Sequence, residues 1–145
     1  MNDTLITFQG NVGGDVEVRQ AGESPVARFR VACTPRRYVR KDDAWVDDDT
    51  QWYTVSAWRA LAEHCGRSLR RGDPVFVQGR LRASTWTNSG GVVMTTYDVE
   101  AVVVGHDLNR GTASFTRTQR PGADRAEAPG EERSEEPAQA ATVAA

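Results

Sequence analysis

The chain is short and close to electrical neutrality. It has 145 residues, a formal net charge of -2 at pH 7 and four tryptophans. This length suits one domain, or one domain followed by a tail. A net charge near zero disfavours binding to duplex nucleic acid through total charge alone, although a local basic groove stays compatible with it. No apolar run approaches the roughly 18 residues of a membrane-spanning helix, so no membrane partner is expected.

The N-terminus and the cysteines bear on the cellular compartment. Residues 1–4 lack the basic and apolar regions of a secretory signal, which predicts a cytoplasmic protein. Cys33 and Cys65 are then expected to be free and buried, while a bridge within the chain or between subunits stays open. His64 and His106 are not spaced with them as zinc ligands, so neither a metal nor another cofactor is expected.

Alternating hydrophobicity predicts three strands in the first part of the chain. They cover 5–12, 27–34 and 51–58, and 16–19 is a candidate continuation of the first strand after a bulge. The segment 35–50 combines several cations with a run of aspartates. It is predicted to be a long charged hairpin loop.

The second part of the chain holds the predicted helix and two longer strands. Apolar residues at every fourth position predict a helix over 60–69. Strands are predicted over 74–86 and 92–105, joined by a hairpin turn over 88–91. The character of the chain changes from Asn109 onward, and 117–145 is rich in Ala, Pro, Gly, Glu and Arg without periodicity, so 109–145 is predicted to be a disordered tail.

These elements define the expected fold class. Residues 1–108 form one all-β domain, a five-stranded OB-fold barrel with one helix between the third and fourth strands. A β-sandwich is disfavoured because about seven strands would be expected. OB-folds bind oligonucleotides on one sheet face and its adjoining loops.

Three of the predicted strands have an unusual polar face. In each, alternate residues form an apolar face, while the opposite face carries tryptophan, arginine or both. Large aromatic side chains on a polar sheet face are suited to stacking on flat partners, of which nucleic-acid bases are the obvious candidates. The tryptophans are expected to stack on bases, and the arginines to contact phosphates. The residues on these faces are Trp52, Trp58, Trp86, Arg28, Arg30, Arg80 and Arg82.

The charged loop adds further candidates. Its cations are expected to help hold phosphates, although nearby aspartates would weaken that attraction. Asp47, Asp48 and Asp49 could instead suggest the metal site of a nuclease, but no residue is placed as a general base, so an enzyme is not expected. The phosphate-binding candidates in this loop are Arg36, Arg37, Arg40 and Lys41.

Four segments in order resemble the bacterial single-stranded DNA-binding protein family. They lie at 8–19, 26–32, 58–63 and 69–81, and the resemblance extends over 4–108. The last reads LRRGDPVFVQGRL and is similar to the family pattern L-x-K-G-x-x-V-x-V-x-G-x-L. The residues at 34–38, TPRRY, resemble actinobacterial members.

The resemblance implies roles for particular residues. Family members stack bases on aromatic side chains at positions that match Trp52, Trp58 and Trp86 here. Tyr38 is the nearest match to a further stacking residue in the long loop, and Trp45 is a second candidate. The family is usually a homotetramer, so a homo-oligomer is expected.

Many relatives end in an acidic tip that closes with an aromatic residue and docks replication and repair enzymes. The last residues here, 140–145, read AATVAA. The resemblance is therefore to a paralogue without this tip, which leaves docking of replication and repair proteins through the tail open.

The leading hypothesis is a non-catalytic cytoplasmic, nucleoid-associated protein that binds single-stranded DNA with little sequence preference. It would serve replication, recombination, repair or chromosome maintenance. The alternative is an OB-fold module of the replication machinery that binds protein and uses its tryptophans in an interface.

Overall fold

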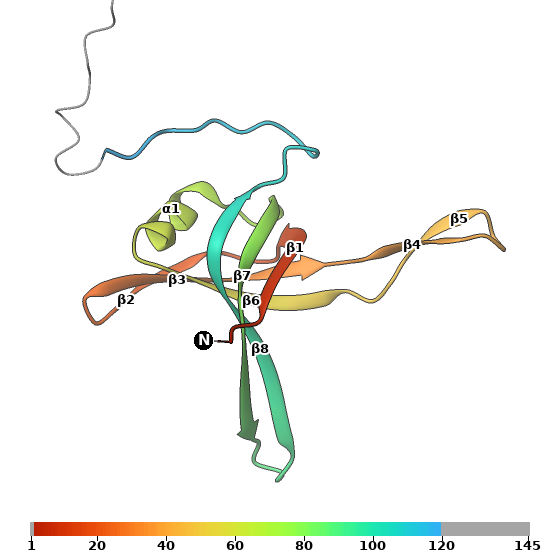
Figure 1. Cartoon of the computed structure of the whole chain (residues 1–145), viewed down its shortest axis with the longest axis horizontal. Coiled ribbons are helices and arrows are strands. Elements are labelled where there is room, and N and C mark those ends of the chain that lie inside the picture. The colour runs from red at the N-terminus through yellow and green to blue at the C-terminus, as the bar shows by residue number, and fades with distance from the viewer. Residues whose placement is uncertain (1, 120–145) are drawn as a thin grey trace, which may run out of the picture. The chain divides into compact units, whose positions relative to one another are not determined.

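A computed structural model describes residues 2–119 of the chain (Figure 1). Met1–Ala113 form one compact unit, and the following residues are assigned to a second. The predicted disordered tail therefore lies largely outside the described residues. The elements are β1 (Leu5–Val12), β2 (Glu17–Ala21), β3 (Ser24–Cys33), β4 (Arg36–Val39), β5 (Ala44–Asp47), β6 (Gln51–Trp58), α1 (Ala60–Ser68), β7 (Pro74–Thr87) and β8 (Val93–His106).

The main sheet closes into a barrel. Its strand order is β1-β7-β8-β6-β3-β2, and β1 also pairs with β3 through Asn11 and Val12. Every pairing is antiparallel except β6 with β8. Gly10 permits the closure, because a Cβ there would lie 2.4 Å from the carbonyl oxygen of Ala32. The predicted OB-fold, with α1 between β6 and β7, is confirmed.

Half of the core residues are valines, whose β-branched side chains fit the pleated inner face of the barrel. It confirms the predicted alternation within the barrel, because most of the predicted inner residues of β3, β6 and β7 are buried while the tryptophans and arginines opposite them are exposed or half-exposed. The alternation ends in the outer part of β7, where the predicted inner residue Ala83 is exposed. Helix α1 adds Ala62 and Cys65 to this core. The buried residues are Val12, Ala27, Phe29, Val31, Val55, Ala57, Ala62, Cys65, Leu69, Val75, Val77 and Val99.

Two predictions about the first half of the chain were wrong. The segment 16–19 does not continue β1: Val16 lies outside any strand, and 17–19 belong to β2, which is followed by a turn at Gly22 and pairs antiparallel with β3. The segment 35–50 is not a loop, because it contains the paired strands β4 and β5. Opposite charges and two aromatic rings face each other across these strands, and such cross-strand pairs stabilise a hairpin. The chain therefore has more strands than the five expected.

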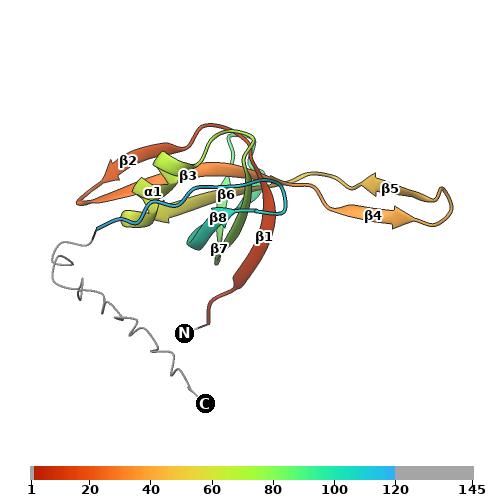
Figure 2. The ribbon, with the colours of Figure 1, turned by 90° about the horizontal axis from the view of Figure 1, so that it is seen from above.

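Two hairpins extend from the barrel in different directions (Figures 1 and 2). One is β4–β5, called the arm below, which continues from β3 and β6. The other is the outer half of β7–β8, which stays paired as far as Thr87 and Val93. Both carry predicted DNA-binding residues away from the barrel, Trp86 on the outer part of β7 and the loop candidates on the arm.

Two smaller findings concern cysteines and membranes. Cys33 and Cys65 are both free thiols, Cys33 half-buried and Cys65 buried. Between residues 2 and 119, no helix is long and apolar enough to cross a membrane.

Candidate nucleic-acid interface

Strand register brings the predicted arginines together on the outer face of the barrel. Two adjacent rows cross β7, β8, β6 and β3, each with an arginine at both ends, a carboxylate and a hydroxyl between them. The first row is Arg82, Asp98, Thr54 and Arg30; the second is Arg80, Glu100, Ser56 and Arg28. We call them the central rows.

Tryptophans flank the central rows. Trp52 and Trp58 lie on β6, Trp52 on the outer side of the first row and Trp58 on the outer side of the second. Their side chains are 49% and 43% exposed. Trp86 is 49% exposed and lies on β7 in the outer hairpin, opposite Met94. Half-exposed indole rings on a polar face are available to stack on a partner.

Trp52 is held in place by its neighbours. The guanidinium carbon of Arg30 lies 4.5 Å from the centroid of the Trp52 ring, within the range of a cation–π contact. Gly13 lies against the ring edge, because a Cβ on Gly13 would be only 2.4 Å from Cζ3 of Trp52. The Gly13 N–H also donates a hydrogen bond of 2.8 Å to the carbonyl oxygen of Arg30. The turn after β1 thus fixes the position of the indole.

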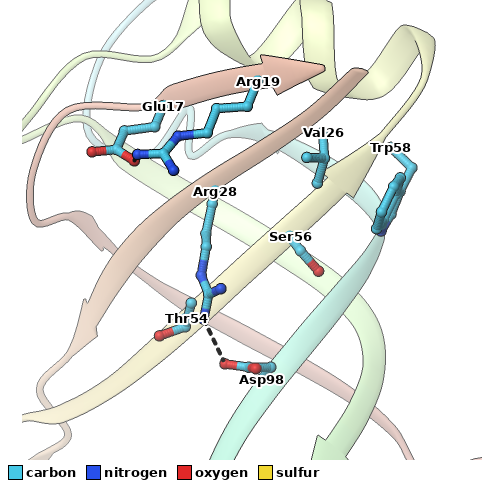
Figure 3. A pocket seen from close by; sticks show the side chains of 8 residues that line it. All are labelled: Glu17, Arg19, Val26, Arg28, Thr54, Ser56, Trp58 and Asp98. Atoms are coloured by element: carbon cyan, nitrogen blue, oxygen red, sulfur yellow. Dashed lines mark hydrogen bonds and ion pairs between the residues drawn. The ribbon is translucent and has the colours of Figure 1, made fainter. Parts of the chain in front are cut away.

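Trp58 borders an open hollow of about 380 Å³ (Figure 3). The indole lies at one end and the Arg28–Asp98 pair at the other, with Ser56 of β6 between them and Thr54 beside the pair. The lining residues are Glu17, Arg19, Val26, Arg28, Thr54, Ser56, Trp58 and Asp98.

A second open hollow of about 570 Å³ lies beside Trp52. Arg30 and Thr54 line it from the polar face, and Tyr97 lines it from β8. Tyr97 is 54% exposed and was not among the predicted site residues. Tyr97 lies two residues before buried Val99 on β8, so the alternation of the strand alone would have assigned it to the core. It is exposed because this part of β8 extends beyond the barrel.

Carboxylates pair with three of the four arginines of the central rows. Arg28 lies 3.7 Å from Asp98, and Arg80 and Arg82 lie 3.8 and 3.6 Å from Glu100. Arg80 also lies 3.4 Å from Asp3. Such exposed pairs contribute at most about 1 kcal/mol each to stability. Asp98 and Glu100 were not among the predicted site residues. The alternation of Thr96, Asp98 and Glu100 along β8 would have placed both acids on the polar face.

The arm holds the remaining predicted residues, away from the central rows. Arg36 and Arg37 pair with Asp47 and Asp48 at 2.8 and 2.9 Å. The rings of Tyr38 and Trp45 face each other with centroids 5.6 Å apart. The Tyr38 hydroxyl donates to Asp43. Arg40 and Lys41 lie in the exposed turn at the tip.

Within residues 2–119, no cluster of His, Cys, Asp and Glu is arranged to hold a metal ion. The described site therefore consists of aromatic rings, arginines, hydroxyls and acids on one sheet face and on two hairpins.

The fold and this face define a class: an OB-fold protein with stacking and charged side chains exposed on its sheet. The chain belongs to the single-strand binding protein family, whose model matches residues 1–107. Members of this family are non-catalytic DNA-binding proteins, in agreement with the prediction that the chain is not an enzyme.

Individual relatives agree with this assignment. The chain is 46% identical over 123 residues to single-stranded DNA-binding protein 1 of Streptomyces coelicolor, covering 85% of this chain and 78% of that protein. The crystal structure of a small single-stranded DNA-binding protein from S. coelicolor matches with a TM-score of 0.69 and 43% identity, covering 77% of this chain and all of that one. The second single-stranded DNA-binding protein of Mycobacterium smegmatis matches with a TM-score of 0.59 and 30% identity, covering 80% of this chain and all of that one. The predicted actinobacterial resemblance is confirmed.

Proposed function

We propose that the protein binds single-stranded DNA with little sequence preference and protects it during replication, recombination, repair or chromosome maintenance. The observation that carries this proposal is the pair Trp52 and Trp58, half-exposed on either side of the central rows. Bases stacked on the two rings would be roughly 20 Å apart at about 3.3 Å per residue of strand, so the rings mark separate points on one DNA path.

Stacking and phosphate contacts have separate roles in this proposal. Each base stacked on an indole contributes about 1–3 kcal/mol and requires no particular base. The arginines at the ends of the central rows contact phosphates, and Arg28, Arg80 and Arg82 exchange their carboxylate partners for them. Duplex DNA keeps its base faces covered, and we therefore expect it to bind much more weakly.

The arm extends the proposed DNA path. Tyr38 and Trp45 offer exposed rings on one side of the hairpin. Arg36, Arg40 and Lys41 supply cations along it and at its tip.

We also propose that the protein forms a homotetramer, which the family resemblance supports. Sedimentation equilibrium would measure the mass of the assembly.

Titration with oligo-dT, followed by tryptophan emission, tests the proposal. We expect strong quenching at low salt and little effect of a duplex of equal length. Trp52→Ala and Trp86→Ala should each weaken binding of a labelled oligonucleotide, measured by anisotropy, by about five- to fiftyfold. Leu108→Ala, which removes an exposed side chain outside the polar face, is the matched control.

Unquenched emission and no binding at low salt would contradict the proposal and favour the protein-binding alternative. Affinity that is unchanged in both tryptophan variants would contradict the stacking roles alone.

A further inference from the structure

The hollow beside Trp58 is lined by the carboxylate of Asp98. Asp98 comes from β8 in the middle of the sheet, and its side chain is 33% exposed. Its partner Arg28 is 65% exposed, and the 3.7 Å between them is too long for a hydrogen bond. The Asp98 carboxylate therefore keeps hydrogen-bond acceptor capacity for a ligand in the hollow that it lines.

The other polar groups of the hollow discriminate less between ligands. The hydroxyls of Thr54 and Ser56 can donate or accept a hydrogen bond. Glu17 already accepts a hydrogen bond of 3.1 Å from Arg19. Arg28 has a long, exposed side chain and is assigned above to a phosphate. Asp98 differs from these groups because its carboxylate acts only as a hydrogen-bond acceptor and is carried by a short side chain on a central strand.

We propose that Asp98 reads the base in this hollow by accepting a hydrogen bond from an exocyclic amino group, which favours cytosine over uracil and thymine. This inference rests on the proposed binding of single-stranded DNA and adds a weak base preference to it. An ionised carboxylate only accepts hydrogen bonds, and cytosine offers its N4 amino group. Uracil and thymine offer the O4 carbonyl at that position. Their N3–H lies between two carbonyl oxygens, both of which repel a carboxylate that approaches it.

The test compares oligo-dC with oligo-deoxyuridine of the same length, which avoids the methyl group of thymine. For each protein variant, the ratio of the two dissociation constants is measured by anisotropy. Dividing the wild-type ratio by the variant ratio cancels the different self-stacking of the two oligonucleotides. It also cancels any general gain in affinity from removing a negative charge.

Asp98→Asn should reduce the preference for oligo-dC about threefold, because the amide can rotate to donate to O4. Glu100→Gln is the matched control. It removes the same charge from the same face of β8, but Glu100 does not line the hollow and faces Arg80 and Arg82. It should leave the ratio unchanged. In a second measurement, wild-type protein should lose the preference when N4,N4-dimethylcytosine replaces cytosine.

The outcomes separate the two proposals. No binding of either oligonucleotide overturns the proposed function itself. Binding with the same ratio for wild-type protein, Asp98→Asn and Glu100→Gln overturns only the role of Asp98, as does a shift of the ratio toward oligo-dC in Asp98→Asn.

Discussion

At the scale of single residues, Gly13 sets the position of Trp52. A methyl group on Gly13 would overlap the edge of the indole, whereas nothing lies within 4 Å of a Cβ built on Gly14. Because the contact is at the surface, we expect it to affect the position of the Trp52 ring more than the free energy of unfolding. Gly13 is therefore a positioning residue for the proposed stacking.

Gly13→Ala should displace the Trp52 ring and weaken oligo-dT binding about threefold to tenfold. This loss is smaller than that expected for Trp52→Ala, because a displaced ring can still stack in part. The wavelength of tryptophan emission should shift as well, because the indole changes its surroundings. Gly14→Ala is the control and should have neither effect. Equal affinities for the two variants would contradict the assignment.

Cys65 gives a pH-dependent contribution to stability. Burial raises the pKa of its thiol from 9.0 to about 11. The native thiol stays neutral to higher pH than the exposed thiol of the unfolded chain, so the unfolded state gains stability by releasing its proton first. The contribution is complete below pH 9 and is lost as the pH rises from about 9 to about 11.

Cys65→Ala should reduce the free energy of unfolding by about 1–2 kcal/mol at pH 7.5, because it removes a buried side chain. This loss should shrink by pH 10.5, since the variant has no thiol to ionise. Urea unfolding of both proteins at the two pH values measures it. A loss that does not depend on pH would show that the native thiol titrates like an exposed one.

At the scale of elements, the junction between β6 and α1 has a backbone conformation that costs energy. Arg59 precedes the helix with φ 58° and ψ −129°, a region that a residue with a Cβ seldom adopts. Its N–H donates a hydrogen bond of 2.9 Å to the carbonyl oxygen of Pro25, which holds the conformation. The junction directly follows Trp58, so this turn also fixes where β6 ends.

Arg59→Gly should raise the free energy of unfolding by about 1 kcal/mol, because glycine adopts this conformation without the Cβ penalty. Arg59→Ala keeps the penalty and controls for loss of the guanidinium. Thermal melts of the two variants would measure the difference. Identical midpoints would mean that the turn is unstrained.

The arm holds two of its cations in ion pairs. Arg36 and Arg37 are paired with aspartates of the opposite strand and the residue after it, all of them exposed. Phosphates of a bound strand would compete with these carboxylates for the same guanidinium groups. The arm thus contributes less attraction than its number of cations suggests.

Asp47→Asn should strengthen oligo-dT binding at low salt about twofold to threefold, while changing the free energy of unfolding by less than about 1 kcal/mol. Glu23→Gln makes the same change in charge at the β2–β3 turn, away from the arm, and should have a smaller effect on affinity. Should both variants bind equally, total charge and not the Arg36–Asp47 pair would account for the change.

At the scale of the whole molecule, most of the fold and part of the site could be predicted from the sequence. Burial in a strand alternates with a period of two residues, which is local information, so Trp52 and Arg28 were assigned to the correct face. The pairing of Arg28 with Asp98 depends on which strands are neighbours, and that is set by barrel closure. The arm was missed because its charges are typical of a loop, while their pairing across two strands is visible only once the register is known.

The balance of charge over the central rows predicts a shallow salt dependence. When phosphates take the arginines, Asp98 and Glu100 are left to bind cations from solution, which reduces the net release of counterions. The double substitution Asp98→Asn with Glu100→Gln should steepen the slope of log K against log salt by about 1. Titrations across salt concentrations measure the slope. An unchanged slope would mean that these acids stay paired with arginines in the complex.

The carboxylates of the central rows also have a consequence for kinetics. A phosphate that leaves Arg80 or Arg82 can be replaced at once by Glu100, which lies within 4 Å of both. A departing DNA segment therefore does not leave a bare cation behind, and this lowers the barrier to its release. We expect nucleotides to exchange rapidly across this face, so that a bound strand can be handed to another protein segment by segment while the rest of it stays held.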